Sequence, residues 1–205
     1  MASLTAAEAR EGIPGLTGTA ADTAIDTIIG RVDALIAKYL GFPPATVGAN
    51  PSFETATLIR YLPGPMFDDP QALALGIYPV QSVTSIYDDP TRGYAADTLV
   101  ASGDYTLDGQ TGIVWLSPTG TRSAWSKGPR AVKATIVAGW STVPKVIKEA
   151  AIREVAMRWR WRHQPQAVQS SSKGGASSST RIPADDVLPE TKVALAGLVL
   201  PGSIL

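Results

Sequence analysis

The segment 130–163, RAVKATIVAGWSTVPKVIKEAAIREVAMRWRWRH, changes from the period of a strand to the period of a helix. Small and branched apolar residues first alternate with more polar ones, at Val132, Ala134, Ile136 and Ala138. Pro144 then suits the first turn of a helix, and apolar residues recur in one row at Ile147, Ala151, Val155 and Trp159. The segment therefore predicts a strand with one covered face, followed by a helix that ends before Pro165.

A second helix is predicted upstream, over residues 19–40. Apolar residues recur there at three- and four-residue spacing, at Ile25, Ile28, Ile29, Val32, Leu35, Ile36 and Tyr39. Thr19 or Asp22 is expected to cap the start of this helix, and Gly41 with the prolines after it to end it. Before it, residues 5–11 predict one short helical turn within a mobile N-terminal arm.

Residues 53–140 predict an antiparallel β unit. Short runs rich in branched and aromatic residues alternate there with turn residues: FETATLIRYL, VQSVTSIYDD, DYTLDGQTGIVWL and RAVKATIVAGW. Turns are indicated by the Asp108-Gly109 pair and by residues 88–90 and 117–120. We expect the long helix 19–40 to cover the apolar face of this unit.

The composition changes again after the helix of residues 145–163. Residues 166–182 are rich in serine and glycine and nearly free of apolar side chains, so they predict a flexible, disordered linker. Apolar spacing then returns at Val187, Leu188, Val193, Leu195 and Leu198. This terminal segment is expected to form a helix that needs a groove on its own domain or on a partner, and to become ordered on assembly.

These elements together predict an α+β fold that is mainly α, a helical bundle with a small antiparallel β element and a flexible C-terminal arm. The predicted divisions are an N-terminal arm over 1–18, a core over 19–165, the linker over 166–182 and a docking segment over 183–205.

The composition narrows the possible classes of protein. Of the 205 residues 44% are hydrophobic, enough for a core, and 18 basic residues balance 18 acidic ones, so no overall field attracts nucleic acid or anionic lipid. The absence of cysteine excludes disulfides, thiolate zinc sites and cysteine nucleophiles. The N-terminal sequence does not resemble a signal peptide. No apolar stretch approaches the roughly 18 residues of a membrane-spanning helix. A soluble, unsecreted protein without membrane contact is therefore expected.

No group of residues indicates catalysis, a cofactor or a metal. His163 is the single histidine and lies near a helix end, where a bond to helix carbonyls is a more ordinary role than catalysis. Asp68-Asp69 and Asp88-Asp89 each precede a proline, so turn formation outweighs acid–base or metal use. No Gly-Lys-Ser/Thr phosphate loop occurs. The expected protein is therefore not an enzyme.

Residues 157–163 are unusual because arginines alternate with tryptophans. Residues two apart differ by about 200° on a helix, so Arg158, Arg160 and Arg162 surround its axis. A subunit or partner interface is the preferred interpretation, while intramolecular packing with solvated arginines and phosphate contact stay open. Trp159 is expected in the core and Trp161 on an assembly surface.

The order of these segments resembles the head–tail connector, or adaptor, proteins of tailed phages and related gene-transfer particles. An amphipathic helix ending in KYLG precedes the β stretch IYPVQSVTSIYDD and the hairpin DYTLDGQTGIVWL. A strand, Ala-Gly, a proline and a helix follow in VKATIVAGWSTVPKVIKEAAIREVAMRWRWR. The resemblance spans residues 20–163 and rests on order and spacing, and the N-terminal arm and the Ser/Gly insertion depart from it.

This resemblance implies an oligomeric ring, such as a dodecamer, that lies between portal and tail and extends the DNA channel without an active site or sequence-specific DNA binding. The implied partners are the portal protein, the next neck or tail protein and further copies of the chain. The implied location is the head–tail interface of the virion, after synthesis in the bacterial host cytoplasm. The residues expected at assembly interfaces are Arg158, Arg160, Trp161, Arg162, Val187, Leu188, Val193, Leu195 and Leu198.

Two other functions stay open at this point. The chain is alternatively another neck or tail-completion component, or a DNA-contacting oligomer whose Trp/Arg segment touches DNA in the channel. A small hydrolase or other enzyme with a site that the sequence does not reveal is the third hypothesis.

Overall fold

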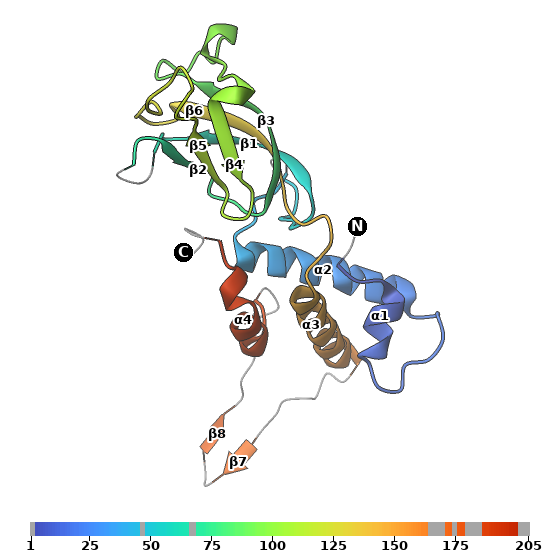
Figure 1. Cartoon of the computed structure of the whole chain (residues 1–205). Helices are drawn as coiled ribbons and strands as arrows, with labels where there is room; N and C mark the ends of the chain where they lie inside the picture. Colours follow the sequence, from blue (N-terminus) through green and yellow to red (C-terminus); the bar gives the residue numbers. More distant parts are fainter. Residues whose placement is uncertain are drawn as a thin grey trace. The chain divides into compact units, whose positions relative to one another are not determined.

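The computed structural model describes residues 3–45, 48–65, 69–163, 171–173, 176–178 and 186–200. The chain divides into two compact units. Unit 1 comprises Met1–Pro43, Asn50–Ser52 and Thr142–Val199, and unit 2 comprises Pro44–Ala49, Phe53–Ser141 and Leu200–Leu205. Helices α1 to α4 belong to unit 1 and strands β1 to β6 to unit 2 (Figure 1).

Unit 1 is built around two helices of 19 residues each. Its helical elements are α1 (Ala6–Glu11), α2 (Asp22–Leu40), α3 (Lys145–His163), α4 (Pro189–Leu195) and the 3₁₀ turn η3 (Ala196–Leu198). Helix α3 packs against α2, α1 packs against both, and α4 packs against α3. Within the predicted linker, β7 (Ser171–Lys173) pairs antiparallel with β8 (Ala176–Ser178), and the other residues of 166–182 lie outside the described part.

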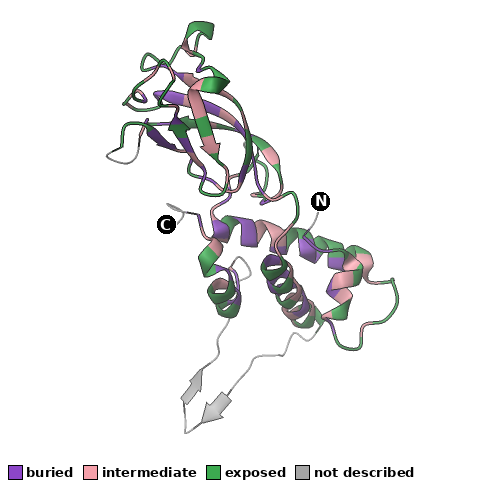
Figure 2. Ribbon diagram, in the orientation of Figure 1, coloured by how far each residue is buried: buried purple, intermediate pink, exposed green. Residues whose placement is uncertain are grey.

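Helix α2 has the boundaries that its sequence predicts at one end only. Gly41 ends it in the left-handed conformation, with φ of 86°, where glycine has no Cβ penalty. At the start Ala21 is the N-cap and forms no side-chain bond, so neither Thr19 nor Asp22 caps the helix. Asp22 instead pairs with Arg10 of α1 at 3.2 Å. The apolar row of α2 is buried (Figure 2), at Ile25, Ile28, Ile29, Val32, Ile36, Ala37 and Leu40.

The predicted helical turn near the N-terminus is α1. Thr5 and Glu8 form a reciprocal capping box at its start, which satisfies two of the free backbone amides. Leu4, Ala9 and Ile13 are buried. This part of the chain therefore packs as part of unit 1.

Unit 2 contains two antiparallel three-stranded sheets. The first has the order β1 (Ala56–Leu62), β6 (Val132–Ala138), β3 (Val80–Asp88), and the second has the order β2 (Ala72–Ala74), β5 (Ile113–Leu116), β4 (Tyr105–Asp108). The 3₁₀ turns η1 (Ala96–Thr98) and η2 (Ser102–Asp104) connect β3 to β4. The β4–β5 turn is held to the start of β3, because the Val80 amide donates to the Gly109 carbonyl at 2.8 Å.

The prediction of a mainly α helical bundle is wrong. Of the residues that the structure describes, 35% are helical and 23% lie in strands, and strands β1 to β6 form two three-stranded sheets. Both sheets contribute fully buried side chains to unit 2, Ile86 and Ile136 from the first and Val114 from the second. The β segment thus carries a core of its own. Alternation along a strand shows that one face is covered, but it does not show whether a helix or another sheet covers it.

Asp89 organises the loop that follows β3. Its carboxylate accepts hydrogen bonds from the Thr91 amide and hydroxyl at 2.7 and 2.6 Å, and from the amides of Gly93 and Tyr94 at 2.8 and 2.7 Å. These bonds, led by that of the Thr91 hydroxyl, lower the pKa of Asp89 to about 2. The turn interpretation of Asp89 is confirmed. Asp88 instead is buried and pairs with Arg122 at 2.8 Å.

We expect Asp89→Asn to remove part of the acid dependence of stability. Because the folded pKa of Asp89 lies below its unfolded value, the charge stabilises the fold fully above about pH 4, and this contribution is lost as the pH falls through about 2. The difference between the urea midpoints of the wild type and the variant should be constant near neutral pH and narrow toward pH 2. A difference that does not change between these values contradicts the role of the carboxylate.

Candidate assembly surface at the end of helix α3

The last two turns of α3 present the alternating arginines and tryptophans. Upstream the helix is anchored by its buried residues, Ile147, Ala150, Ala151, Glu154, Val155 and Ala156. Arg160 and Arg162 are exposed at the C-terminal end, where the helix dipole favours cations. Among the residues that the structure describes, neither has a carboxylate partner. This end of the helix therefore presents two positive charges to solvent.

Trp159 and His163 form a stacked pair on this end. Their ring centroids are 4.0 Å apart, with 28° between the ring planes. The His163 Nδ1 lies 3.0 Å from the Trp159 carbonyl oxygen, which can only accept, so Nδ1 donates. The prediction that His163 bonds to a helix carbonyl is confirmed. The assignment of Trp159 to the core is wrong, because its indole and that of Trp161 are both half-buried.

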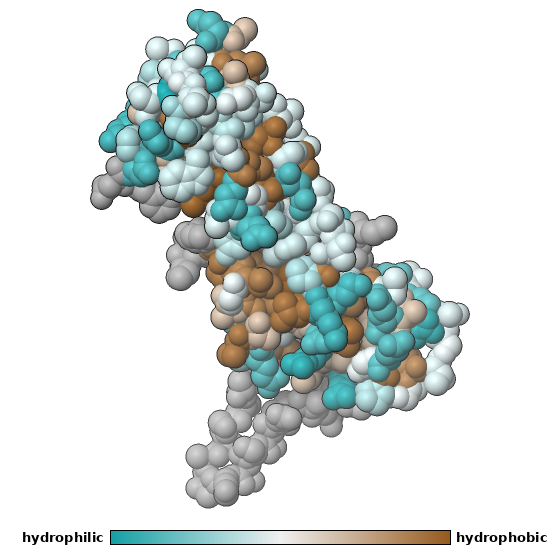
Figure 3. Space-filling view, in the orientation of Figure 1, coloured by the Kyte–Doolittle hydropathy of each residue, from teal (hydrophilic) through white to brown (hydrophobic). Residues whose placement is uncertain are grey.

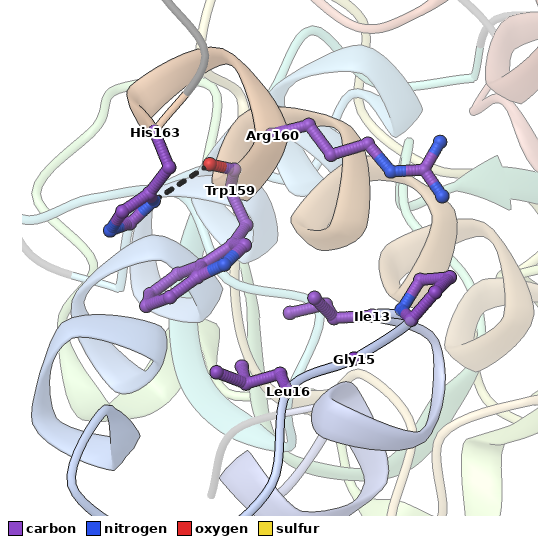
Figure 4. Close-up of a pocket in the computed structure, with 7 residues that line it drawn as sticks. Ile13, Gly15, Leu16, Trp159, Arg160 and His163 are labelled. Carbon is purple, nitrogen blue, oxygen red and sulfur yellow. Dashed lines mark hydrogen bonds between the residues drawn. The ribbon is translucent and has the colours of Figure 1, made fainter.

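A pocket of about 430 Å³ lies beside this stacked pair (Figure 4). One wall comes from the loop after α1 and the other from the last turn of α3. The lining residues are Ile13, Pro14, Gly15, Leu16, Trp159, Arg160 and His163. The lining combines the apolar side chains of Ile13, Leu16 and Trp159 with the cationic Arg160, which suits an apolar side chain next to a negative charge.

Glu154 connects α3 to the terminal segment. The residue is 1% exposed, and its carboxylate accepts from the Leu188 amide at 2.6 Å and from the Arg158 Nε at 3.4 Å. Arg158 in turn donates to the Asp186 carbonyl at 2.6 Å. A buried carboxylate needs such partners, because removing a charge from water is costly. Glu154 and Arg158 therefore fix the entry to α4.

Asp186 and Lys192 fix the rest of the segment. Their side chains pair at 2.7 Å, and the Val187 amide also donates to Asp186 at 2.7 Å. The hydrogen bond from Lys192, and next that from the Val187 amide, lower the pKa of Asp186 below its ordinary value. The Tyr39 hydroxyl of α2 donates to the Lys192 carbonyl at 3.0 Å. We call Glu154, Arg158, Asp186 and Lys192 the α4 clasp.

The structure brings together some of the predicted interface residues and separates others. Val187, Leu188 and Leu195 are buried, so the groove that the terminal segment occupies is on its own unit. Val193 is 78% exposed on α4, and Leu198 is half-buried in η3. In the view of Figure 3, hydrophobic surface gathers around α4, while hydrophilic residues cover much of α3. Residues 183–185 and 201–205 of the predicted docking segment lie outside the described part.

Sequence reasoning missed Glu154, which is the polar centre of this region. An acidic residue inside the apolar row of α3, four residues before an arginine, was the available signal, since residues at this spacing are neighbours on a helix.

The described residues offer no grouping of three His, Asp or Glu side chains that could hold a metal ion. No described helix has the length and apolar character needed to cross a bilayer.

Comparisons with known proteins identify similarity only at the level of structure. No protein-family model matches the sequence. No curated protein sequence matches it either.

Chains from particle necks have a similar fold. One comes from the neck of an empty GTA particle computed with C6 symmetry, with 18% identity and a TM-score of 0.53 over 88% of this chain and 83% of that one. Another comes from the neck of a native GTA particle computed with C12 symmetry, with 16% identity and a TM-score of 0.52 over 96% and 88% of the two chains. GTA stands for gene transfer agent. The chain thus has the fold of a component found in these necks.

Proposed function

We propose that the chain is a structural protein of the neck of a gene transfer agent or a related phage-like particle, where it forms the adaptor ring between portal and tail. The observation that carries the proposal is the similarity of its fold to chains of two GTA necks, over 88% and 96% of its length. The order of its segments, which resembles that of head–tail connectors, supports the same function independently.

The symmetry of those necks, which were computed with C6 and C12 symmetry, supports a ring. A cyclic assembly repeats one contact between identical subunits until it closes. Six or twelve copies of the chain therefore form the proposed homo-oligomer. This ring surrounds the DNA channel of the virion, with the portal on one side and a tail protein on the other.

We assign the partner contact to the exposed end of α3 and to α4. Arg160, Trp161 and Arg162 provide cationic and aromatic side chains, which are favoured at interfaces, next to the pocket of Trp159. The exposed Val193 and the half-buried Leu198 extend this surface. The remaining predicted residues act indirectly by holding α4 in place, namely Arg158, Val187, Leu188 and Leu195.

Trp161→Ala is expected to weaken assembly and to leave folding intact. The indole is half-buried and lies outside the buried row of α3, so its loss should hardly change the thermal midpoint. Incorporation into purified particles should fall by roughly tenfold or more, as for an interface anchor. Val146→Ala, at the exposed start of the same helix, is the control. Equal incorporation of the two variants contradicts the assignment.

Deleting the gene tests the function itself. Particles made without the chain should be filled or leaking heads without attached tails, visible by negative-stain microscopy, and a plasmid copy should restore the tails. Normal tailed particles in the deletion strain would refute the adaptor role.

A DNA-contacting role is a second candidate, favoured by the two exposed arginines at the end of α3. It predicts binding of the isolated chain to duplex DNA that weakens with salt, because each phosphate contact releases a counterion. Arg160→Ala with Arg162→Ala would then reduce the salt slope by about 2. The adaptor function instead predicts no such binding at physiological salt.

A further inference from the structure

Unit 2 has a second surface that the proposed partner contact does not use. It is the outward face of the first sheet, where the strand register aligns Tyr61 of β1, Lys133 of β6 and Tyr87 of β3. The next row on this face begins with Ile59, which is 57% exposed, while Tyr61 is 42% exposed. We call Ile59, Tyr61, Tyr87, Arg130 and Lys133 the cationic face.

Cations and aromatic rings are interleaved on the cationic face. The Arg130 guanidinium lies 4.1 Å from the centre of the Tyr61 ring, and the Lys133 ammonium lies 5.4 Å from that of Tyr87. Tyr94 joins them, since its hydroxyl donates to the Arg130 carbonyl at 2.6 Å and its ring is 5.7 Å from that of Tyr61. These contacts hold both cations in place before any partner arrives.

Among the residues that the structure describes, neither Arg130 nor Lys133 pairs with a carboxylate. The positive charge of the cationic face is therefore not balanced by an ion pair within this part of the chain. Leu99 forms an isolated antiparallel β-bridge with Tyr87 and is 46% exposed. Nucleic acid would pair with the two cations but would not account for the exposed aliphatic side chains of Ile59 and Leu99. Tyrosine, arginine and aliphatic side chains together are typical of a protein interface. The partner surface should thus be acidic and apolar.

The second sheet of the same unit offers such a surface. Trp115 of β5 is 41% exposed, and the register places it beside Thr106 of β4, on the same face as Asp108. Strands β2, β4 and β5 contain no lysine or arginine. Hydrogen bonds, first from the Thr111 hydroxyl, lower the pKa of Asp108, so its charge is present at neutral pH. We call Thr106, Asp108 and Trp115 the acidic face.

We propose that the cationic face of one copy binds the acidic face of the next copy and that this contact closes the ring. The inference rests on the proposed ring function and names its subunit contact. Each sheet buries one face in the core of unit 2, so the two exposed faces point away from that core in different directions. Two different complementary patches on one subunit give a head-to-tail contact, which forms rings when the rotation closes.

Cross-linking of assembled particles tests this contact. The chain has no cysteine, so Thr57→Cys on the outward face of β1 and Thr106→Cys on β4 can be introduced without background. Both positions are exposed. Thr57 lies on the same side of β1 as Ile59 and Tyr61 of the cationic face, and Thr106 belongs to the acidic face, so the contact brings the two thiols close together. With a short bis-maleimide, particles carrying the double variant should give a ladder of dimers, trimers and higher species, whereas each single variant should stay monomeric. A dimer from one single variant, or no ladder from particles that contain the chain, overturns the contact.

The same cross-linking experiment distinguishes failure of the subunit contact from two other results. If the chain is absent from particles, the proposed neck function fails, whereas particles that contain the chain without a ladder refute only the subunit contact. If the thiol of the Thr57→Cys variant reacts with a maleimide in empty particles but is protected in full ones, the cationic face contacts DNA, which also overturns the proposal.

Lys133→Glu should reduce the yield of cross-linked species roughly tenfold or more, because it places like charges opposite each other in the proposed contact. Lys145→Glu, at an exposed lysine of unit 1, should leave the ladder unchanged.

Discussion

Replacing Glu154 by alanine should lower the free energy of unfolding by roughly 3–5 kcal/mol, because it leaves the Arg158 cation and the Leu188 amide without their buried acceptor. The Arg158 side chain is only 14% exposed and cannot fully recover its hydration. Chemical denaturation measures this loss. Hydrogen exchange should also show that the amides of α4 lose protection before those of α2, since the α4 clasp holds the terminal segment.

Glu149→Ala is the matched control for this prediction. Glu149 lies on the same helix and pairs with Lys145 at 3.6 Å, but its side chain is 53% exposed, so its loss should cost less than about 1 kcal/mol. Glu154→Gln should fall between the two, since it keeps an acceptor for the Leu188 amide but loses the charge. Equal losses for Glu154→Ala and Glu149→Ala would show that the clasp does not stabilise unit 1.

Gly139→Ala should destabilise unit 2 by roughly 3 kcal/mol or more. Gly139 follows β6 with φ of 110°, a sparsely populated conformation that costs a residue with a side chain about 1–3 kcal/mol. A Cβ atom there would lie 2.3 Å from the Glu54 carbonyl oxygen, so the backbone before β1 would have to move. The expected result is a lower urea midpoint.

Gly48→Ala separates the two causes. Gly48 also has a positive φ, 87°, but apart from its chain neighbours no described residue comes within 4 Å of the position that an added Cβ would occupy, so this variant should show the conformational cost alone. If Gly139→Ala costs no more than Gly48→Ala, the close approach to Glu54 does not constrain the fold.

Local patterns in the sequence predicted individual elements well and their tertiary assembly poorly. The row of isoleucines in α2 and the apolar row after Pro144 follow the period of a helix, which is a local property, so the sequence shows them directly. The pairing of β1 with β6 joins residues far apart in the chain, such as Leu58 and Ile136, and turn signals do not encode such partners. The arrangement of two sheets therefore could not be predicted.

The candidate surface shows the same limit. The alternation of arginine and tryptophan predicted an exposed cationic helix end, and Arg160 and Arg162 are exposed there. How far the Trp159 side chain is buried depends on the path of the loop that contains Ile13 and Leu16. The helical period of α3 does not determine that path. The docking of Leu188 on Glu154 likewise joins residues 34 apart in the sequence.

Cryo-electron microscopy of the neck of purified particles decides whether this chain forms the adaptor ring. A ring of six or twelve copies of this chain is expected around the DNA channel between portal and tail, with unit 1 and unit 2 each fitting the density. Density for the chain elsewhere in the particle, or a neck ring built without it, would contradict the proposed function.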